Sequence, residues 1–152
     1  MAVFVDADAA PRDVVASTRE LGRHYGIPVW VVSSVNHQLT GPDCIQVDAH
    51  PQATDLEIVK RLNGQVRALV ITQDYGLAVL ALAKGAQALS PCGREYTAQN
   101  IDLLLFEREL HAHERKVSGK SRGPRARTEA DRIEFKRALQ RVLSEWATQQ
   151  RK

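Results

Sequence analysis

The chain has 152 residues, of which 43% are hydrophobic, so it is long and apolar enough to bury a core, and global disorder is excluded. Its longest apolar runs fall far short of the ~20 residues that a transmembrane helix needs. The opening MAVFVDADAA has neither a positively charged n-region nor a long apolar h-region, so we expect no secretory signal. Two cysteines make neither a disulfide framework nor a zinc site, so we expect a cytoplasmic protein. The net charge is +3, and we expect no membrane contact.

Short apolar runs alternate with amphipathic segments along the first 110 residues. Strands are predicted at Val3–Val5, Val29–Ser34, Cys44–Val47, Ala68–Ile71 and Gln87–Leu89. Helices are predicted at 12–25, about 54–62, 77–84 and about 97–116. Strands alternating with helices indicate parallel βαβ units, and uninterrupted apolar strands are typical of a sheet covered on both faces. The fold class predicted is therefore α/β, with three layers and a mostly parallel central sheet.

Local signals set the expected ends of these elements. Gly26 stands where the glycine cap of a helix C-terminus belongs. Thr54 and Glu57 have the spacing of a capping box, in which each would bond the backbone of the other. Residues 91–96 are predicted to form a loop, and Thr97 is predicted to cap the helix that follows.

The last third of the chain is basic, because residues 1–104 carry a net charge of −3 and residues 105–152 carry +6. This asymmetry indicates a polyanionic partner such as nucleic acid, although a solvated basic helix explains it equally well. We divide the chain into an α/β domain (1–116), a basic flexible linker (117–127) and an amphipathic C-terminal helix (128–152). The apolar stripe of that last helix, formed by Phe135, Leu139, Val142 and Trp146, must pack on the body or on another subunit.

Four aspartates lie where a sheet of this kind forms its site. Asp6 and Asp8 follow the first strand, Asp74 follows the fourth, and Asp55 begins a helix. Sites in open α/β sheets form outside the carboxyl ends of the strands, where the strand order reverses, so the acids converge if the first and fourth strands are neighbours there. Clustered carboxylates repel one another, and a hard cation such as Mg²⁺ or Mn²⁺ relieves that repulsion. Such a cation supports hydrolysis of phosphodiesters or phosphomonoesters.

Each acid also has a purely structural interpretation. Asp6 or Asp8 would accept hydrogen bonds from the first turn of the following helix, and Asp55 would favour a helix dipole. Asp74 would serve only the turn before Gly76.

Several ordered motifs resemble one family. The motifs are VDADAAP, ITQDYGLA, GREYT, NIDLLLF and a basic linker with GP followed by TEADR. Together they resemble the YaiI/YqxD family of uncharacterised bacterial cytoplasmic proteins over nearly the whole chain. That family is grouped, more distantly, with PIN-like and NYN-like metal-dependent ribonucleases. The resemblance implies a Rossmann-like, PIN-like domain with an acidic Mg²⁺ or Mn²⁺ site, in which Asp6, Asp55 and Asp74 match the acids by position.

One departure from the PIN pattern affects this site. PIN-type nucleases usually carry a further acid about three residues beyond the fourth-strand aspartate, where this chain has Leu77. Either Asp8 or Asp102 must take its place, or the site binds one ion weakly.

The leading hypothesis is a divalent-metal-dependent nuclease that cleaves single-stranded RNA, in preference to DNA, with Asp6, Asp8, Asp55 and Asp74 as catalytic and metal-binding residues. Arg94 would hold a phosphate or orient a carboxylate unless it is a surface ion pair. The other phosphate-binding candidates are Lys116, Lys120, Arg122, Arg125 and Arg127. The alternatives are a non-catalytic nucleic-acid-binding or protein-interaction module, and a haloacid-dehalogenase-like phosphatase with Asp6 as nucleophile and Asp8 as acid/base. Homo-oligomerisation is left open.

Overall fold

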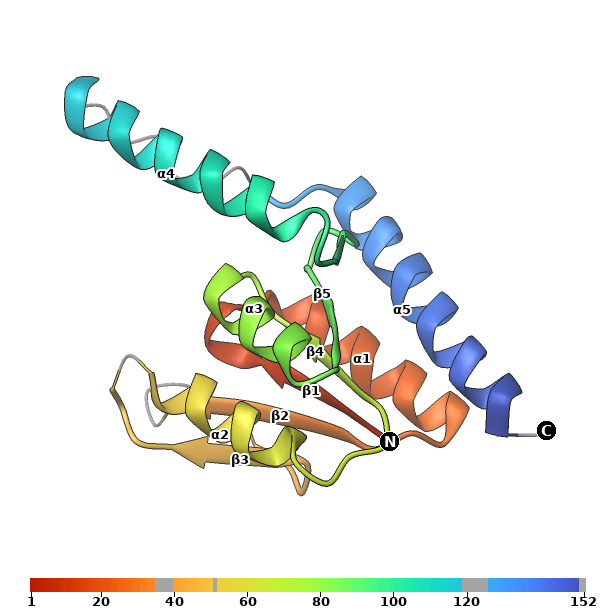
Figure 1. The fold of residues 1–152 in the computed structure, drawn as a ribbon. Helices are drawn as coiled ribbons and strands as arrows, with labels where there is room; N and C mark the ends of the chain where they lie inside the picture. Colours follow the sequence, from red (N-terminus) through yellow and green to blue (C-terminus); the bar gives the residue numbers. More distant parts are fainter. Residues whose placement is uncertain (35–39, 51, 119–125, 151–152) are drawn as a thin grey trace.

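The fold is built on one twisted sheet (Figure 1). The computed structural model describes residues 1–34, 40–50, 52–118 and 126–150. In these ranges six strands lie in the order β3-β2-β1-β4-β5-β6, with β6 antiparallel to β5 and all other neighbours parallel. The strands are β1 (Ala2–Asp6), β2 (Val29–Ser34), β3 (Cys44–Val47), β4 (Ala68–Ile71), β5 (Gln87–Leu89) and β6 (Glu95–Tyr96). The predicted mostly parallel sheet is confirmed.

Helices cover both faces of the sheet, which confirms the three layers. They are α1 (Arg12–Tyr25), α2 (Ala53–Leu62), α3 (Tyr75–Ala83), α4 (Ile101–Ser118) and α5 (Glu129–Gln150), with a 3-10 turn η1 (Ala7–Ala9). The side chains of α1 and α5 share one buried cluster with the sheet, and those of α2, α3 and the first turns of α4 share the other. No helix in the described parts of the chain is long and apolar enough to cross a membrane.

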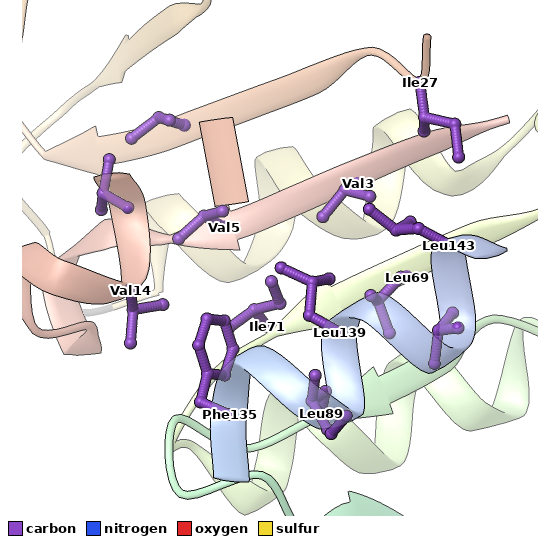
Figure 2. Packing of buried hydrophobic residues seen from close by; sticks show 14 of the residues in the cluster. Val3, Val5, Val14, Ile27, Leu69, Ile71, Leu89, Phe135, Leu139 and Leu143 are labelled. Carbon is purple, nitrogen blue, oxygen red and sulfur yellow. The ribbon is translucent and has the colours of Figure 1, made fainter. Parts of the chain in front are cut away.

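Strand β1 shows why the strands read as uninterrupted apolar runs. Its side chains alternate between the two faces, and Val3 and Val5 join the α1/α5 cluster while Phe4 joins the opposite one. All three are buried. Figure 2 shows Val3 and Val5 on the side of the sheet that Phe135 of α5 covers. Since both faces are covered, every position of the strand favours an apolar side chain.

Helix α5 packs on the body, which settles the choice that the sequence left between the body and another subunit. Its predicted stripe is buried from Phe135 to Trp146. Trp146 also donates a hydrogen bond from Nε1 to Gln87 Oε1 on β5, at 3.0 Å. This helix is therefore part of the core rather than an appendage.

The boundaries of the linker differ from the prediction. Val117 and Ser118 belong to α4 rather than to the linker, and residues 119–125 lie outside the described residues. Arg127 precedes α5 and donates Nε and Nη2 to the two carboxylate oxygens of Asp13 at 2.8 and 2.9 Å. It also donates to the carbonyl of Pro91 at 2.6 Å. These contacts fix the start of α5 against α1 and the loop after β5.

The predicted capping box at Thr54 is wrong. Helix α2 begins at Ala53 with Gln52 as its N-cap, so Thr54 lies inside the helix. Its hydroxyl instead donates to Asp8 Oδ2 at 2.6 Å. Glu57 forms an ion pair with Arg61 one turn later, at 2.7 Å. The sequence pattern was misleading because the partner of Thr54 lies 46 residues away.

Other boundaries also differ from the expected ones, and α3 begins at Tyr75 rather than at Leu77. Residues 95–96 form β6 rather than part of a loop, because the chain turns back at Gly93 and Tyr96 pairs with Ala88. Helix α4 begins at Ile101, four residues after Thr97. Thr97 and Asn100 bond each other's backbone N–H groups through their side chains, which forms a turn before the helix.

Candidate functional site

The site lies where the strand order reverses. From β1 the chain moves outward through β2 to β3, and it then returns to β4 on the other side of β1. Val5 and Ile71 are register partners, so the carboxyl ends of β1 and β4 are adjacent. The condition that the sequence placed on convergence of the acids is therefore met.

Asp6 ends β1 and is the most buried of the four acids, with 3% of its surface exposed. The Thr72 hydroxyl donates to Asp6 Oδ2 at 2.7 Å. Burial raises the pKa of Asp6 to about 6, the charges of Asp8 and Asp74 raise it further, and the hydrogen bond from Thr72 opposes the shift. At neutral pH this carboxylate is therefore held charged in an unfavourable environment.

Asp8 lies in η1 and links three elements at the edge of the sheet. Its Oδ1 accepts a hydrogen bond from the backbone N–H of Ser34 on β2, at 3.0 Å, and its Oδ2 accepts the one from Thr54 on α2. The side chain nevertheless stays exposed to solvent. These contacts keep Asp8 beside Asp6, where its charge contributes to the raised pKa of Asp6.

Asp74 and Asp55 approach from α3 and α2. Asp74 caps α3, because its Oδ1 accepts the N–H of Gly76 at 2.8 Å, so its structural interpretation is confirmed alongside its place in the cluster. Partial burial raises the pKa of Asp55 to about 6, and the charges of Asp74, Asp6 and Asp8 add to the shift. All four predicted acids thus share one electrostatic environment.

The structure also bears on the acid of the PIN pattern that this chain lacks. Leu77 is fully buried in α3 and takes no part in the site. Asp8 is among the charges that raise the pKa of both Asp6 and Asp55. Asp102 lies on the exposed side of α4 and is not among them. Of the two substitutes, Asp8 is the one in the cluster.

The four carboxylates are suitable ligands for a hard cation, but their present arrangement is not that of a metal site. Carboxylate oxygens are the ligands that Mg²⁺ and Mn²⁺ prefer, and mutual repulsion gives the cluster a reason to bind one. Within the described residues, however, no group of three or more His, Cys, Asp and Glu side chains is arranged to hold a metal ion. Protein donors already occupy oxygens of Asp6 and Asp8. The four acids therefore fit the cation in kind, although their present arrangement does not form a metal-binding group.

The predicted phosphate-binding residues are scattered. Arg94 precedes β6 and is exposed, with its backbone N–H bonded to Ser90 Oγ at 3.0 Å. Lys116 is exposed near the end of α4. Arg127 forms the ion pair with Asp13 described above, and its binding to RNA stays a prediction. Lys120, Arg122 and Arg125 lie outside the described residues.

Sequence reasoning missed two features beside the acids. Thr72 holds Asp6 from the end of β4, and Tyr96 in turn donates its hydroxyl to the Thr72 carbonyl at 3.1 Å. Arg108 on α4 places its guanidinium carbon 5.8 Å from the ring centre of Tyr75, the residue after Asp74. Arg108 follows Leu104 by four residues on the packed face of α4, and that spacing was the available signal.

Comparisons with known proteins agree with the motifs. A family model described as "Uncharacterized BCR, YaiI/YqxD family" matches residues 4–145. A UPF0178 protein of Heliobacterium modesticaldum is 40% identical over 146 residues, which cover 96% of this chain and 99% of that protein. A UPF0178 protein of Oceanobacillus iheyensis is 43% identical over 142 residues, covering 89% and 93% of the two chains. No solved structure gives a significant match.

Proposed function

The chain belongs to the YaiI/YqxD family, and from its acidic sheet edge we propose that it is a divalent-metal-dependent nuclease that hydrolyses phosphodiester bonds of single-stranded RNA. The observation that carries the proposal is the cluster of Asp6, Asp8, Asp55 and Asp74 at the reversal of strand order, in which two carboxyls have pKa values raised to about 6. Near neutral pH this repulsion costs free energy, and a bound Mg²⁺ or Mn²⁺ ion would remove that cost.

Asp6, Asp55 and Asp74 would hold the ion, with Asp8 as the further acid. When bound, the ion supplies an activated water and positive charge for the phosphate oxygens. Thr72 and Thr54 fix the orientation of Asp6 and Asp8 through their hydroxyl groups, as outer hydrogen bonds commonly do for metal ligands. The distant PIN-like resemblance supports the same assignment.

Two groups that suit RNA contact each other next to Asp74 in the chain, namely the Tyr75 ring and the Arg108 guanidinium. Arg108 offers a guanidinium for a phosphate, and Tyr75 offers an aromatic ring next to Asp74. The basic last third of the chain would add affinity that the acidic body lacks, through contacts to phosphates that weaken with salt. A flexible single strand enters an edge lined by loops and strand ends more easily than a rigid duplex does.

The test is cleavage of labelled single-stranded RNA with Mn²⁺ or with a chelator. We expect Asp74→Asn to lower the metal-dependent rate at least ~100-fold, since it removes one carboxylate from the cluster. Asp102→Asn is the matched control, because Asp102 is an exposed aspartate outside the cluster, and its rate should equal that of the intact protein. Activity that persists in both Asp74→Asn and Asp6→Asn would come from another source and would contradict the proposal.

A second candidate is a nucleic-acid-binding module without catalysis. It is favoured by the hydrogen bonds that already occupy Asp6 and Asp8, and by the present arrangement of the acids. RNA binding without cleavage, across a broad panel of RNA and single-stranded DNA, would select this candidate. The phosphatase alternative needs Asp6 as an accessible nucleophile, and its 3% exposure disfavours that role.

A further inference from the structure

Helix α4 carries its two arginines on the side that continues its packed face. Ile101 and Leu104 are buried in the cluster that α4 shares with α2, α3 and the sheet. Arg108, His111 and Arg115 follow Leu104 at steps of four, three and four residues, which keeps all five side chains within an arc of roughly 80°. The four acids of the helix fall outside this arc, namely Asp102, Glu107, Glu109 and Glu114. We call Arg108, His111 and Arg115 the α4 basic row.

The row begins at the acidic edge, which is formed by the carboxyl ends of β1 and β4 with their aspartates. The guanidinium carbon of Arg108 lies 5.8 Å from the centre of the Tyr75 ring, and Tyr75 opens α3 directly after Asp74. Because α3 starts soon after β4 ends, this contact places the middle of α4 at the carboxyl end of β4. Residues 109–118 extend a further ~15 Å, and Figure 1 shows this half of α4 beyond the other helices. The rest of the row therefore leads away from the acidic edge.

The Tyr75 ring is held in place by a second aromatic ring. Its centre lies 5.7 Å from that of Tyr96, at an interplanar angle of 68°. Tyr96 is buried and donates its hydroxyl to the Thr72 carbonyl. Burial raises the pKa of Tyr96 above its ordinary value, and the charge of Asp74 is among the smaller causes that raise it further. Tyr75 itself stays partly exposed, so a ring of fixed position is accessible to a nucleobase close to Asp74.

The two arginines of the row are available to bind phosphates. Arg108 and Arg115 are exposed, and within the described residues neither forms an ion pair with a carboxylate. Arg137 on α5, by contrast, is paired with a glutamate of its own helix. His111 does have an acidic neighbour, since its Nδ1 lies 3.5 Å from Glu114 Oε2. Two unpaired guanidiniums about 10 Å apart along a helix suit phosphates a nucleotide or two apart along one strand.

We propose that the α4 basic row binds the single-stranded RNA on one side of the cleavage position, with Tyr75 stacked on a base near the acids and Arg108 and Arg115 bound to phosphates farther along. The inference rests on the proposed nuclease function, and it adds the path by which the strand leaves the acidic edge. Phosphates on the row release counterions, whereas residues 1–104 carry a net charge of −3 and repel them. A single strand is required because stacking on Tyr75 needs an unpaired base.

Fluorescence anisotropy with a labelled single-stranded RNA of about 12 nucleotides, in chelator so that nothing is cleaved, tests the path. Replacing both arginines, Arg108→Gln with Arg115→Gln, should weaken binding at least ~5-fold at low salt. It should also reduce the slope of log affinity against log salt by about 1.4, since each phosphate contact of a single strand contributes about 0.7. Arg137→Gln is the matched control, because Arg137 is an exposed helical arginine, 72% accessible, and its binding should equal that of the intact protein.

Variants of Tyr75 test the stacked base in the same assay. Tyr75→Leu should weaken binding and leave the salt slope unchanged, because stacking involves no counterion release. Tyr75→Phe keeps the ring and should bind like the intact protein. No RNA binding by the intact protein, or an unchanged salt slope after both arginines are replaced, would overturn the proposal.

Steady-state cleavage with Mn²⁺ separates failure of the row from failure of the nuclease. The double arginine variant should raise KM for the long strand at least ~5-fold and leave kcat unchanged, since it removes uniform binding. A dinucleotide is too short to lie along the row, so both proteins should cleave it at similar rates. No cleavage by the intact protein, together with the expected change of salt slope, would contradict the nuclease and support the row. Cleavage of the long strand with the same KM in both proteins would overturn the row and leave the nuclease standing.

Discussion

Asp6→Asn will be more stable than the intact protein at about pH 8 in the absence of metal, by on the order of 3 kcal/mol. Asp6 has a pKa of about 6 in the folded protein, against the ordinary aspartate value of 3.8. The folded state therefore keeps this proton to higher pH than the unfolded state, and the stability gained from it is lost as pH rises from about 4 through about 6. Asparagine is neutral throughout and still accepts the hydrogen bond from Thr72.

Urea denaturation at several pH values measures this effect. At about pH 3 the Asp6 carboxyl is protonated and therefore neutral, as the asparagine of the variant is. The difference in stability between Asp6→Asn and the intact protein should therefore vanish. Asp102→Asn, at an exposed position, should stay within about 0.5 kcal/mol of the intact protein at every pH. A variant that gains stability and loses cleavage would place Asp6 among residues kept for activity at the expense of stability. A pH-independent difference would show that Asp6 is not held charged in the core.

Gly93→Ala will destabilise the protein by roughly 2–5 kcal/mol, because it strains the backbone and displaces α5. Gly93 has a φ of +86°, and an added Cβ would lie 2.6 Å from the backbone carbonyl of Glu134. Gly64→Ala is the matched control, since Gly64 has the same φ and a Cβ added there would meet nothing within 4 Å beyond its chain neighbours. Gly64→Ala should lose only ~1–2 kcal/mol, the cost of the left-handed conformation.

The difference between these two alanine variants reports the docking of α5. Thermal or urea denaturation gives both values under the same conditions. Equal losses would mean that α5 does not lie against the loop at Gly93, which would contradict its place in the core.

The sequence predicted the strands well because the core is built from them. Each buried strand shows as an apolar run, and Gly26 marks the end of α1 with a φ of +67°. β6 escaped prediction because two residues are too short for a pattern, and they pair only because of the turn at Gly93. Long-range partners also escaped, as the hydroxyl of Thr54 shows by bonding Asp8 instead of its own helix.

The candidate site was predictable as a set of acids and not as an arrangement. The positions of Asp6 and Asp74 after strands indicated the correct edge, but their proximity required β4 to return beside β1. The hydroxyl of Thr72 carries no local signal of its contact with Asp6. The spacing of Arg108 from Leu104 indicates a shared face of α4, but it does not indicate the contact with Tyr75. The chemistry of the four carboxylates predicts that they bind a cation, and the proposed function depends on that binding.

Titration calorimetry with Mn²⁺ tests that claim most directly. The intact protein should bind Mn²⁺ at about pH 8 and much more weakly at about pH 5, because protonated carboxyls must lose their protons to bind the ion. Near pH 6 the heat should depend on the buffer, since Asp6 and Asp55 release protons on binding. Asp74→Asn should weaken this binding and Asp102→Asn should leave it unchanged. No heat of binding at either pH, or equal binding by Asp74→Asn, would contradict a metal site at the acidic edge.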